Sequence, residues 1–401
     1  MSNTLLTADL ITNESLDVLS NEIVFAKNVR RRYDDKFGNE SLQAGETIKI
    51  RKPDRGTYRS GATYTPDDIT ESSVDITLAQ GGADCNFTTK ELSLDIAMFS
   101  ERILKPRIVT IANEIDRQGL ALYSSVYNQV GTPGTSPNSS SFFLDAGAKL
   151  DNGAAPRDGK RHAILSPRHN ASTVGALQGL FNSQGRISDQ YTKGLMGKDT
   201  LGLNFYQSQN TQSHTVGALG GTPAMNGTTL NGATQIVTNG WTASAAARVK
   251  VGDVFTIANV YSVNPITGQN TGYLQDFTAT AIGSSDGSGN MTIQISPAII
   301  TSGKFATVNA VPVTTALLTF TGTASTAYST SLVYHEDAFA MAMGDLYMPS
   351  GVDMASKKSL DGMSIRFTRA YDVNNDKLPS RLDVLFGWAV LRAEHACRVI
   401  G

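Results

Sequence analysis

The feature that most constrains this chain is one long amphipathic segment, residues 105–127. Its apolar residues recur every three or four positions, which is the spacing of one face of an α-helix. These residues are Ile108, Ile111, Ala112, Ile115, Gly119, Leu122 and Val126. Pro106 suits the first turn of a helix, where its missing N–H needs no partner, and Gly-Thr-Pro at 131–133 predicts the stop. The chain must therefore supply a surface for this apolar stripe.

The polar side of this predicted helix carries Glu114, Asp116 and Arg117. Glu114 and Arg117 are three residues apart, a spacing that allows an ion pair along a helix. We expect this face to be solvated or to contact a partner. A core-packing helix of an ordinary domain is the alternative. The segments that precede the helix favour a partner, because they contain few residues that could form a core.

The first of these segments is an N-terminal arm with one helical pattern, carried by Leu16, Leu19 and Ile23, with Ser15 or Asn13 as a cap. It ends in three arginines, Arg30, Arg31 and Arg32. Cations at a helix C-terminus complement the helix dipole, and an anion-binding patch is the alternative interpretation. An isolated arm of this kind needs something to lie against.

The second segment is a predicted β-ribbon, in which residues 47–53 and 72–80 alternate as strands do. The connection between them is charged and almost free of aliphatic residues, which predicts a long hairpin with a polar tip. A two-stranded ribbon is marginally stable in water, so this one is anchored at its base or clamped by another chain, unless it is disordered. Together with the arginines at 30–32, its charged residues are our candidates for ion pairs between subunits. They are Arg51, Lys52, Asp54, Arg55, Arg59, Asp67 and Asp68.

The sharpest change of composition lies between Gly221 and Thr330, where only six charged residues occur. They are Arg248, Lys250, Asp253, Asp276, Asp286 and Lys304. Five short strands at regular spacing are predicted there, at 235–241, 253–260, 276–282, 291–296 and 316–322. This stretch is therefore predicted to be a separate β module that interrupts a parent domain, which resumes after it.

The rest of the chain gives weaker patterns. Residues 131–160 are predicted to be a loop-rich connection, 162–166 a buried strand and 183–219 turns, with a helix starting near Pro167. Residues 332–344 are predicted to be a strand followed by a short helix. Strands are expected at 363–372, 383–391 and 395–401. Because the chain finishes on a strand pattern, its end should be tied into a sheet.

Composition agrees with a β-rich α+β fold, since charged residues are 17% of the chain and Gly, Ser, Thr and Asn are abundant. The formal net charge of −2 provides no basic field for nucleic acid or an anionic membrane. Cys85 and Cys397 are predicted to be free thiols, because two cysteines imply no disulfide framework. With no basic start and no apolar run of membrane-spanning length, we expect synthesis in a reducing cytoplasm.

No catalytic or metal-binding signature stands out. Residues 283–287 match Gly-x-Ser-x-Gly, but they lie between two predicted strands and not at a strand-to-helix turn. Residues 286–290 could hold calcium, but a hairpin turn explains the same residues and is the preferred interpretation. Residues 194–199 contain a Gly-Lys pair but lack the upstream Gly and the following Ser or Thr of a phosphate loop. The five histidines show no spacing typical of metal ligands. We therefore expect no enzyme, no cofactor and no metal.

The order of these parts resembles the major capsid proteins of tailed bacteriophages, which share the Hong Kong ninety-seven coat fold. The similarity is strongest to the coat proteins of short-tailed phages that carry an inserted β-barrel domain. The residues that carry this resemblance are 104–122, 162–168, 249–260, 332–343 and 371–401. No catalytic motif contributes to it.

The resemblance implies a division of the chain into named parts. They are an N-terminal arm at 1–38, an extended loop at 39–92, a spine helix at 93–130, peripheral and axial domains at 131–220 and 331–401, and an inserted β-barrel at 221–330. It implies a structural protein that assembles as hexamers and pentamers into an icosahedral head shell, located in the virion and assembled in the host cytoplasm. Implied partners are a separate scaffolding protein, a portal and the packaged double-stranded DNA, with no membrane.

Physical reasoning points the same way, because an arm and a ribbon that bury little on their own chain gain stability by lying across neighbouring copies. An alternative from another class is a β-rich binding module, either associated with a phage tail or fibre or displayed on a cell surface. The Gly, Ser, Thr and Asn content favours it, but it accounts poorly for the long helix.

Overall fold

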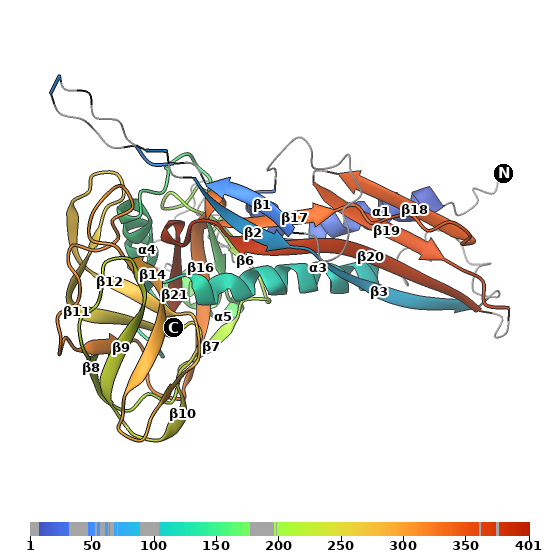
Figure 1. The fold of residues 1–401 in the computed structure, drawn as a ribbon. Coiled ribbons are helices and arrows are strands. Elements are labelled where there is room, and N and C mark those ends of the chain that lie inside the picture. Colours follow the sequence, from blue (N-terminus) through green and yellow to red (C-terminus); the bar gives the residue numbers. More distant parts are fainter. Residues whose placement is uncertain are drawn as a thin grey trace. The chain divides into compact units, whose positions relative to one another are not determined.

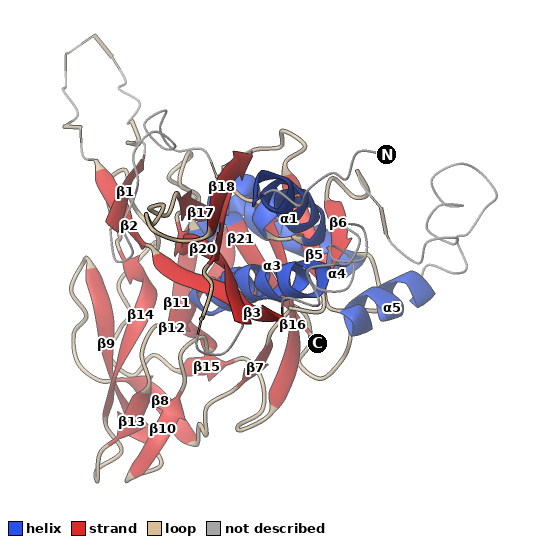
Figure 2. Cartoon of the chain, turned by 90° about the vertical axis from the view of Figure 1, so that its right-hand side faces the viewer, coloured by secondary structure: helices blue, strands red, loops and turns tan. Residues whose placement is uncertain are grey.

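The computed structural model describes residues 8–31, 47–52, 54–56, 61–62, 64, 68–69, 71–88, 104–176, 196–197, 199–360, 362–373 and 377–401. The chain divides into two compact units. Unit 1 is made of Met1–Lys52, Ser72–Gly119 and Phe339–Leu391, and unit 2 of Pro53–Glu71, Leu120–Ala338 and Arg392–Gly401. Both combine helices with sheets (Figures 1 and 2), as the composition predicted.

Unit 1 is built around the long strand β20. Its helices are α1 (Ala8–Glu22) and α3 (Lys105–Leu120), and its strands are β1 (Thr47–Lys52), β2 (Ser72–Thr77), β3 (Ala79–Thr88), β17 (Phe339–Gly344), β18 (Met354–Leu360), β19 (Met363–Arg369) and β20 (Lys377–Val390). Strands β3, β17 and β19 all pair antiparallel with β20, and β18 pairs with β19. Figure 1 shows α3 running along β20.

Helix α3 confirms the predicted apolar stripe but ends earlier than expected. Ile108, Ile111 and Ile115 are all buried. The α-helix stops at Leu120, and the chain continues as a 3₁₀ turn, Ala121–Ser125. Helix ends commonly tighten in this way, and the sequence pattern does not distinguish the two geometries.

The close approach of α3 to its neighbours depends on Gly119. A Cβ at this position would lie 2.6 Å from ring atoms of both Phe25 and Trp388. Phe25 stacks on Trp388 with ring centroids 5.2 Å apart and meets Phe339 edge-on at 5.4 Å. The helix therefore packs onto an aromatic cluster that joins the N-terminal segment to β17 and β20.

One residue of the polar side of α3 contradicts our prediction. Asp116 is 2% exposed, and its carboxylate accepts the backbone N–H groups of Val24, Phe25 and Ala26 at 2.7–3.1 Å. Burial raises the pKa of the Asp116 carboxyl above its usual value, and the three hydrogen bonds oppose that shift because they favour the ionised form. Asp116 therefore ties α3 to the N-terminal segment and is not solvated.

The described part of the N-terminal arm also differs from our expectation. Helix α1 contacts β18 and β19, and Leu16, Leu19 and Ile23 are buried within their own chain. Ser15 lies inside the helix and bonds back to the carbonyl of Ile11, so it is not the cap. Residues 8–31 therefore need no neighbouring subunit for their support.

The ribbon is confirmed at its base, where β1 pairs antiparallel with β2 and Ile48 lies opposite Ile76. Both isoleucines join a buried cluster with residues of β17 and β20, so the ribbon is anchored on its own unit. At Gly387 of β20, a Cβ would lie 2.4 Å from the carbonyl oxygen of Thr77, and only glycine allows this approach. The second predicted strand is in fact two, because the chain passes from β2 into β3 and so into the sheet of β20.

Unit 2 contains a mixed sheet in the order β4-β21-β16-β5-β6, with β7 paired to β16. Its strands are β4 (Gln129–Val130), β5 (Arg161–Leu165), β6 (Asn204–Gln207), β7 (Ser213–Thr215), β16 (Ala327–His335) and β21 (Ala396–Ile400), and its helices are α4 (Ser141–Asn152) and α5 (Pro167–Ala176). Every residue of β5 and β21 is buried. The buried strand, the helix at Pro167 and the C-terminal strand are all confirmed.

Two predictions outside the ribbon are wrong. Helix α4 forms within the expected loop, because Phe143, Ala146 and Leu150 share one face and are buried. The expected short helix after His335 is only a 3₁₀ turn, Glu336–Ala338, and the chain continues as strand β17. Ala and Met favour helices locally, but pairing with β20 overrides that preference.

Residues 221–320 form a sheet in the order β15-β11-β12-β14-β9-β8, beside a two-stranded sheet of β10 and β13. The strands are β8 (Gly221–Met225), β9 (Ala233–Trp241), β10 (Ala245–Val249), β11 (Val254–Val263), β12 (Asn270–Ala279), β13 (Gly283–Ser285), β14 (Met291–Ile299) and β15 (Leu318–Phe320). A bridge between Ala224 and Leu317 joins the two ends of the sheet. The five predicted strands are present, and they enclose a core of their own.

Candidate functional site

The described arginines at the end of the N-terminal arm lie well beyond the end of helix α1. Helix α1 ends at Glu22, so Arg30 and Arg31 lie too far away to complement its dipole. The interpretation of these arginines as the C-terminus of this helix is therefore wrong. The carbonyl of Arg30 accepts the N–H of Met341 at 3.1 Å, which fixes the backbone, while the Arg30 side chain is exposed. Arg32 lies outside the described residues.

The predicted contact residues of the ribbon fall into two groups. Arg51 and Asp68 are exposed, and Lys52 is half-buried. Asp54 and Arg55 bind within their own chain: Asp54 pairs with Lys304 at 2.8 Å and Arg55 with Glu394 at 3.0 Å. Both side chains are therefore already paired within their own chain, and their predicted role in ion pairs between subunits stays a prediction. Arg59 and Asp67 lie outside the described residues.

A buried polar cluster lies where the 221–320 sheet meets the rest of unit 2, and its centre is Arg398 of β21. The guanidinium of this buried arginine donates to the carbonyls of Val126 and Gly252 at 2.7 Å each and to Thr278 Oγ1 at 3.2 Å. Burial lowers the pKa of Arg398 to about 10, so the side chain remains charged at neutral pH. One C-terminal residue thus binds both sides of the junction.

A second chain of contacts runs through His214. Its Nε2 lies 2.8 Å from Asp253 Oδ1, and its Nδ1 lies 3.2 Å from the Tyr123 hydroxyl. The Tyr–His–Asp order resembles a nucleophile, base and orienting acid. However, burial raises the pKa of Tyr123, which is the opposite of activation, and the Arg398 guanidinium lies 5.7 Å from the centroid of its ring. The arrangement is therefore a structural contact.

Two buried carboxylates of the 221–320 sheet face this junction, Asp253 and Asp276. Asp276 pairs with Lys149 of α4 at 2.7 Å, and Asp253 also accepts the N–H groups of Gly217 and Lys250. Lys149 and Arg398 balance the two carboxylates, so the junction is close to neutral. Sequence reasoning missed this cluster. Its signal was two aspartates in an almost uncharged stretch.

The candidate catalytic motifs resolve into turns or partly lie outside the described residues. Gly283 starts strand β13, and Asp286 then accepts the N–H groups of Ser288 and Asn290 at 2.8 Å each in the turn before β14. This is a hairpin and not a nucleophile elbow. Residues 194–199 are described only in part. Among the described residues no group of His, Cys, Asp and Glu could hold a metal ion.

Both cysteines are free and buried. Burial raises the pKa of Cys85 to about 11 and that of Cys397 to about 12. A thiol with such a pKa carries almost no thiolate at neutral pH and is a poor nucleophile. The prediction of two free thiols is confirmed.

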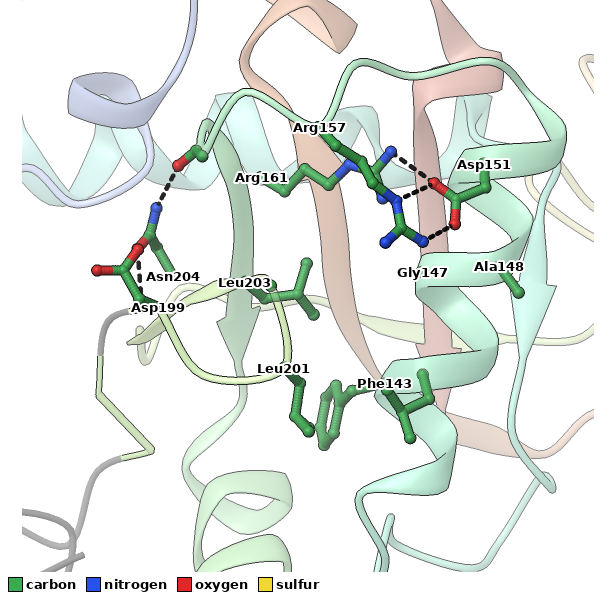
Figure 3. Close-up of a pocket in the computed structure, with 13 residues that line it drawn as sticks. Phe143, Gly147, Ala148, Asp151, Arg157, Arg161, Asp199, Leu201, Leu203 and Asn204 are labelled. Carbon is green, nitrogen blue, oxygen red and sulfur yellow. Dashed lines mark hydrogen bonds and ion pairs between the residues drawn. The ribbon is translucent and has the colours of Figure 1, made fainter. Parts of the chain in front are cut away.

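A pocket of about 310 Å³ in unit 2 is lined by α4 and by the turn at 199–204. Figure 3 shows Arg157 and Arg161 both directed at Asp151, which pairs with Arg161 at 2.8 Å. Hydrogen bonds from the Arg157 and Arg161 guanidinium groups lower the pKa of the Asp151 carboxyl. Because its oxygens are held by two cations, this carboxylate is no general base.

In the part of the chain that the structure describes, no helix is long and apolar enough to cross a membrane. Comparison with solved structures finds a chain from Mycobacterium phage Che8 with a TM-score of 0.43 at 11% identity, covering 94% of this chain and 90% of that one. The capsid structure of the cyanophage P-SCSP1u gives 0.42 at 11% identity, covering 94% and 91%. The CUS-3 coat protein I-domain is 27% identical over 25% of this chain and 94% of its own length, with a TM-score of 0.19. No curated protein matches the chain.

A sequence model of one protein family, described as P22 coat protein, gene protein 5, matches residues 2–400. The match covers almost the whole chain, and a family of coat proteins is a structural, non-catalytic class. It also decides against a fibre-associated or cell-surface binding module. The chain therefore belongs to the P22 coat protein family: it is a major capsid protein of a tailed phage, a virion component that assembles with copies of itself into the head shell.

Proposed function

We propose that this coat protein builds an icosahedral shell of hexamers and pentamers around double-stranded DNA. Assembly takes place in the host cytoplasm with a separate scaffolding protein and a portal. Its fold is that of the Hong Kong ninety-seven coat proteins. The formal net charge of −2 fits a shell that encloses DNA without reading its sequence.

The parts of the chain take the roles of that fold. Residues 1–38 are the arm, 39–92 the extended loop, 93–130 the spine helix, 131–220 and 331–401 the peripheral and axial domains, and 221–330 an inserted β-barrel. The bridge that joins the two ends of the 221–320 sheet supports a barrel. Strands β7 and β16, which flank this stretch in sequence, pair with each other through Ala327 and Thr215. The parent sheet therefore resumes where it was left, as expected for an insertion.

The observation that carries the assembly role is the exposure of two large side chains between β1 and β2. Tyr64 is 82% exposed and Ile69 is 81% exposed. Burying a large apolar side chain contributes about 1.5–3 kcal/mol, and a closed shell repeats each contact in every subunit. We assign Tyr64 and Ile69 to the interface with a second copy, together with the predicted contacts Arg30, Arg31, Arg51 and Asp68.

The experiment replaces Tyr64 and Ile69 by serine in one variant. We expect a folded subunit and at least a tenfold lower yield of closed particles, because each interface loses two apolar contacts of the size given above. The matched control is Ile266→Ser, since Ile266 is 80% exposed and lies between β11 and β12. Electron microscopy of the particles and circular dichroism of the subunit provide the two measurements. A normal particle yield from the double variant contradicts the proposal.

A further inference from the structure

Lys304, between β14 and β15, binds the base of the segment between β1 and β2. Lys304 Nζ donates to Asp54 Oδ2 at 2.8 Å and to the carbonyl oxygen of Asp68 at 2.6 Å. Asp54 and Asp68 lie on the outgoing and returning sides of the segment. One ammonium group therefore binds both sides at once.

The neighbouring phenylalanine adds a second contact to the same base. The Phe305 ring has the Arg55 guanidinium and the Lys304 ammonium each 5.7 Å from its centroid. Arg55 also pairs with Glu394, which follows β20 in the chain. Cations placed over an aromatic face are attracted by its electron density. The outgoing side of the segment is thus held by an ion pair and by a ring.

The turn that carries Lys304 and Phe305 is itself well ordered by hydrogen bonds. Thr307 donates its N–H to the carbonyl of Ile300 at 2.8 Å, and the Ile300 N–H donates to the Thr307 hydroxyl at 3.1 Å. Gly303 takes a positive φ of 86°, which closes the turn. The side chain of Lys304 is only 10% exposed. The lysine therefore starts from a fixed position.

Lys304 is also one of only six charged residues in residues 221–330. Beyond the base, the described side chains of Tyr64 and Ile69 are exposed. The contacts at the base hold the segment without covering these two side chains.

We propose that the turn at 300–307 is a support that fixes the base of the segment between β1 and β2. Lys304 and Phe305 act as positioning residues, and they select which surface of a second copy Tyr64 and Ile69 reach. This inference rests on the proposed function, in which the segment contacts another subunit. It gives the inserted region a role in aiming that contact.

The first test measures the base directly in the isolated full-length subunit. Lys304→Met removes the ammonium and keeps the length of the side chain. We expect trypsin to cleave after Arg55 or Arg59 about tenfold faster, since a charge-assisted hydrogen bond and an ion pair are lost. Lys250→Met is the matched control, because Lys250 is the other lysine of residues 221–330, and its cleavage rate should equal that of the parent.

A second variant tests the same ion pair in case Lys304→Met fails to fold. Asp54→Asn removes the same ion pair from the side of the segment and leaves the 300–307 turn unchanged. It should also accelerate cleavage, by a smaller factor, because the bond from Lys304 to the Asp68 carbonyl remains. An unchanged cleavage rate in both variants overturns the inference.

The second test measures assembly by electron microscopy of particles formed by each full-length variant. We expect Lys304→Met to broaden the distribution of particle diameters and to lower the share of closed shells at least threefold. If Lys304→Met cleaves faster but forms particles of normal size and yield, the support does not direct assembly, and the inference is wrong. The Tyr64 and Ile69 double variant separates the two proposals: if it also assembles normally, the proposed contact itself fails.

Discussion

The sheet of unit 1 and the sheet of residues 221–320 use charge in different ways. In unit 1, charged side chains pair across neighbouring strands: Arg366 of β19 lies opposite Asp383 of β20 and pairs with it, and Arg381 binds the same carboxylate. In residues 221–330, four of the six charged side chains bond outside this stretch. They are Arg248, Asp253, Asp276 and Lys304.

This difference separates two tasks. Cross-strand ion pairs in unit 1 stabilise the sheet that carries them, and the stabilisation is divided among several pairs. Charges of residues 221–330 connect a region with its own apolar core to its surroundings. We therefore expect single substitutions at the connections to have large effects, and those on the unit 1 sheet to have small ones.

The largest effect is expected from Arg398→Met. The substitution removes donors from the carbonyls of Val126 and Gly252 and leaves Asp253 without a neighbouring buried cation. Breaking a buried charge network of this kind costs about 3–5 kcal/mol. The free energy of unfolding is measured by urea denaturation, followed through Trp241 fluorescence.

Two further variants make this measurement specific. The chain has only two tryptophans, Trp241 in unit 2 and Trp388 in unit 1, so Trp388→Phe isolates the signal of the 221–320 sheet. Arg157→Met is the control, because the Arg157 side chain is 74% exposed and solvent screens its ion pair, so its removal should leave the free energy of unfolding almost unchanged. A loss below about 1 kcal/mol for Arg398→Met means that the junction does not depend on this residue.

Acid should also distinguish the two units, because all five histidines of the sequence belong to unit 2. Burial lowers the pKa of His162, His169 and His395 to about 4 each, below the usual 6.5. In the unfolded chain these histidines therefore become protonated below pH 6.5. In the folded unit they stay neutral down to about pH 4. The contribution of each neutral histidine to the free energy of unfolding is fully present above pH 6.5. It is lost as the pH falls from 6.5 to 4, and the loss is about 3 kcal/mol per histidine at pH 4.

The measurement follows both tryptophans between pH 7 and pH 4. The Trp241 signal should respond to acid before that of Trp388, and His395→Gln should reduce the pH dependence of unit 2. Carboxylates with lowered pKa, such as Asp151, lose their contribution only at lower pH. Coincident acid transitions at Trp241 and Trp388 contradict the prediction.

Much of this fold could be predicted because its patterns are local. The stripe of α3, the alternation of β1 and β2 and the strands of residues 221–320 each depend on spacing within one segment. The drop in charged residues after Gly221 also predicted where the 221–320 sheet begins. These features are set by which side of an element is buried, and a single sequence shows that directly.

The errors occur where distant residues decide the outcome. Asp116 looks like a surface residue of α3, and only the backbone N–H groups of Val24, Phe25 and Ala26 make its burial favourable. Arg398 occupies a strand position, but its acceptors lie in segments far away in sequence. No local pattern encodes such partners. Helix α4 was missed for a simpler reason, since its serine, glycine and asparagine content hid the spacing of its buried face.

The smallest effect is expected from Arg381→Ala in the sheet of unit 1. The Arg381 side chain is 53% exposed, and its partner Asp383 is fully buried but also held by Arg366. Because solvent screens the exposed arginine and the carboxylate keeps its second cation, the loss should be about 0.5 kcal/mol. Arg366→Met is the matched comparison, since it leaves Asp383 with only the exposed partner and should destabilise unit 1 more. Trp388 fluorescence during urea denaturation measures both, and equal losses would mean that Arg381 and Arg366 contribute as one unit rather than as a principal and an accessory pair.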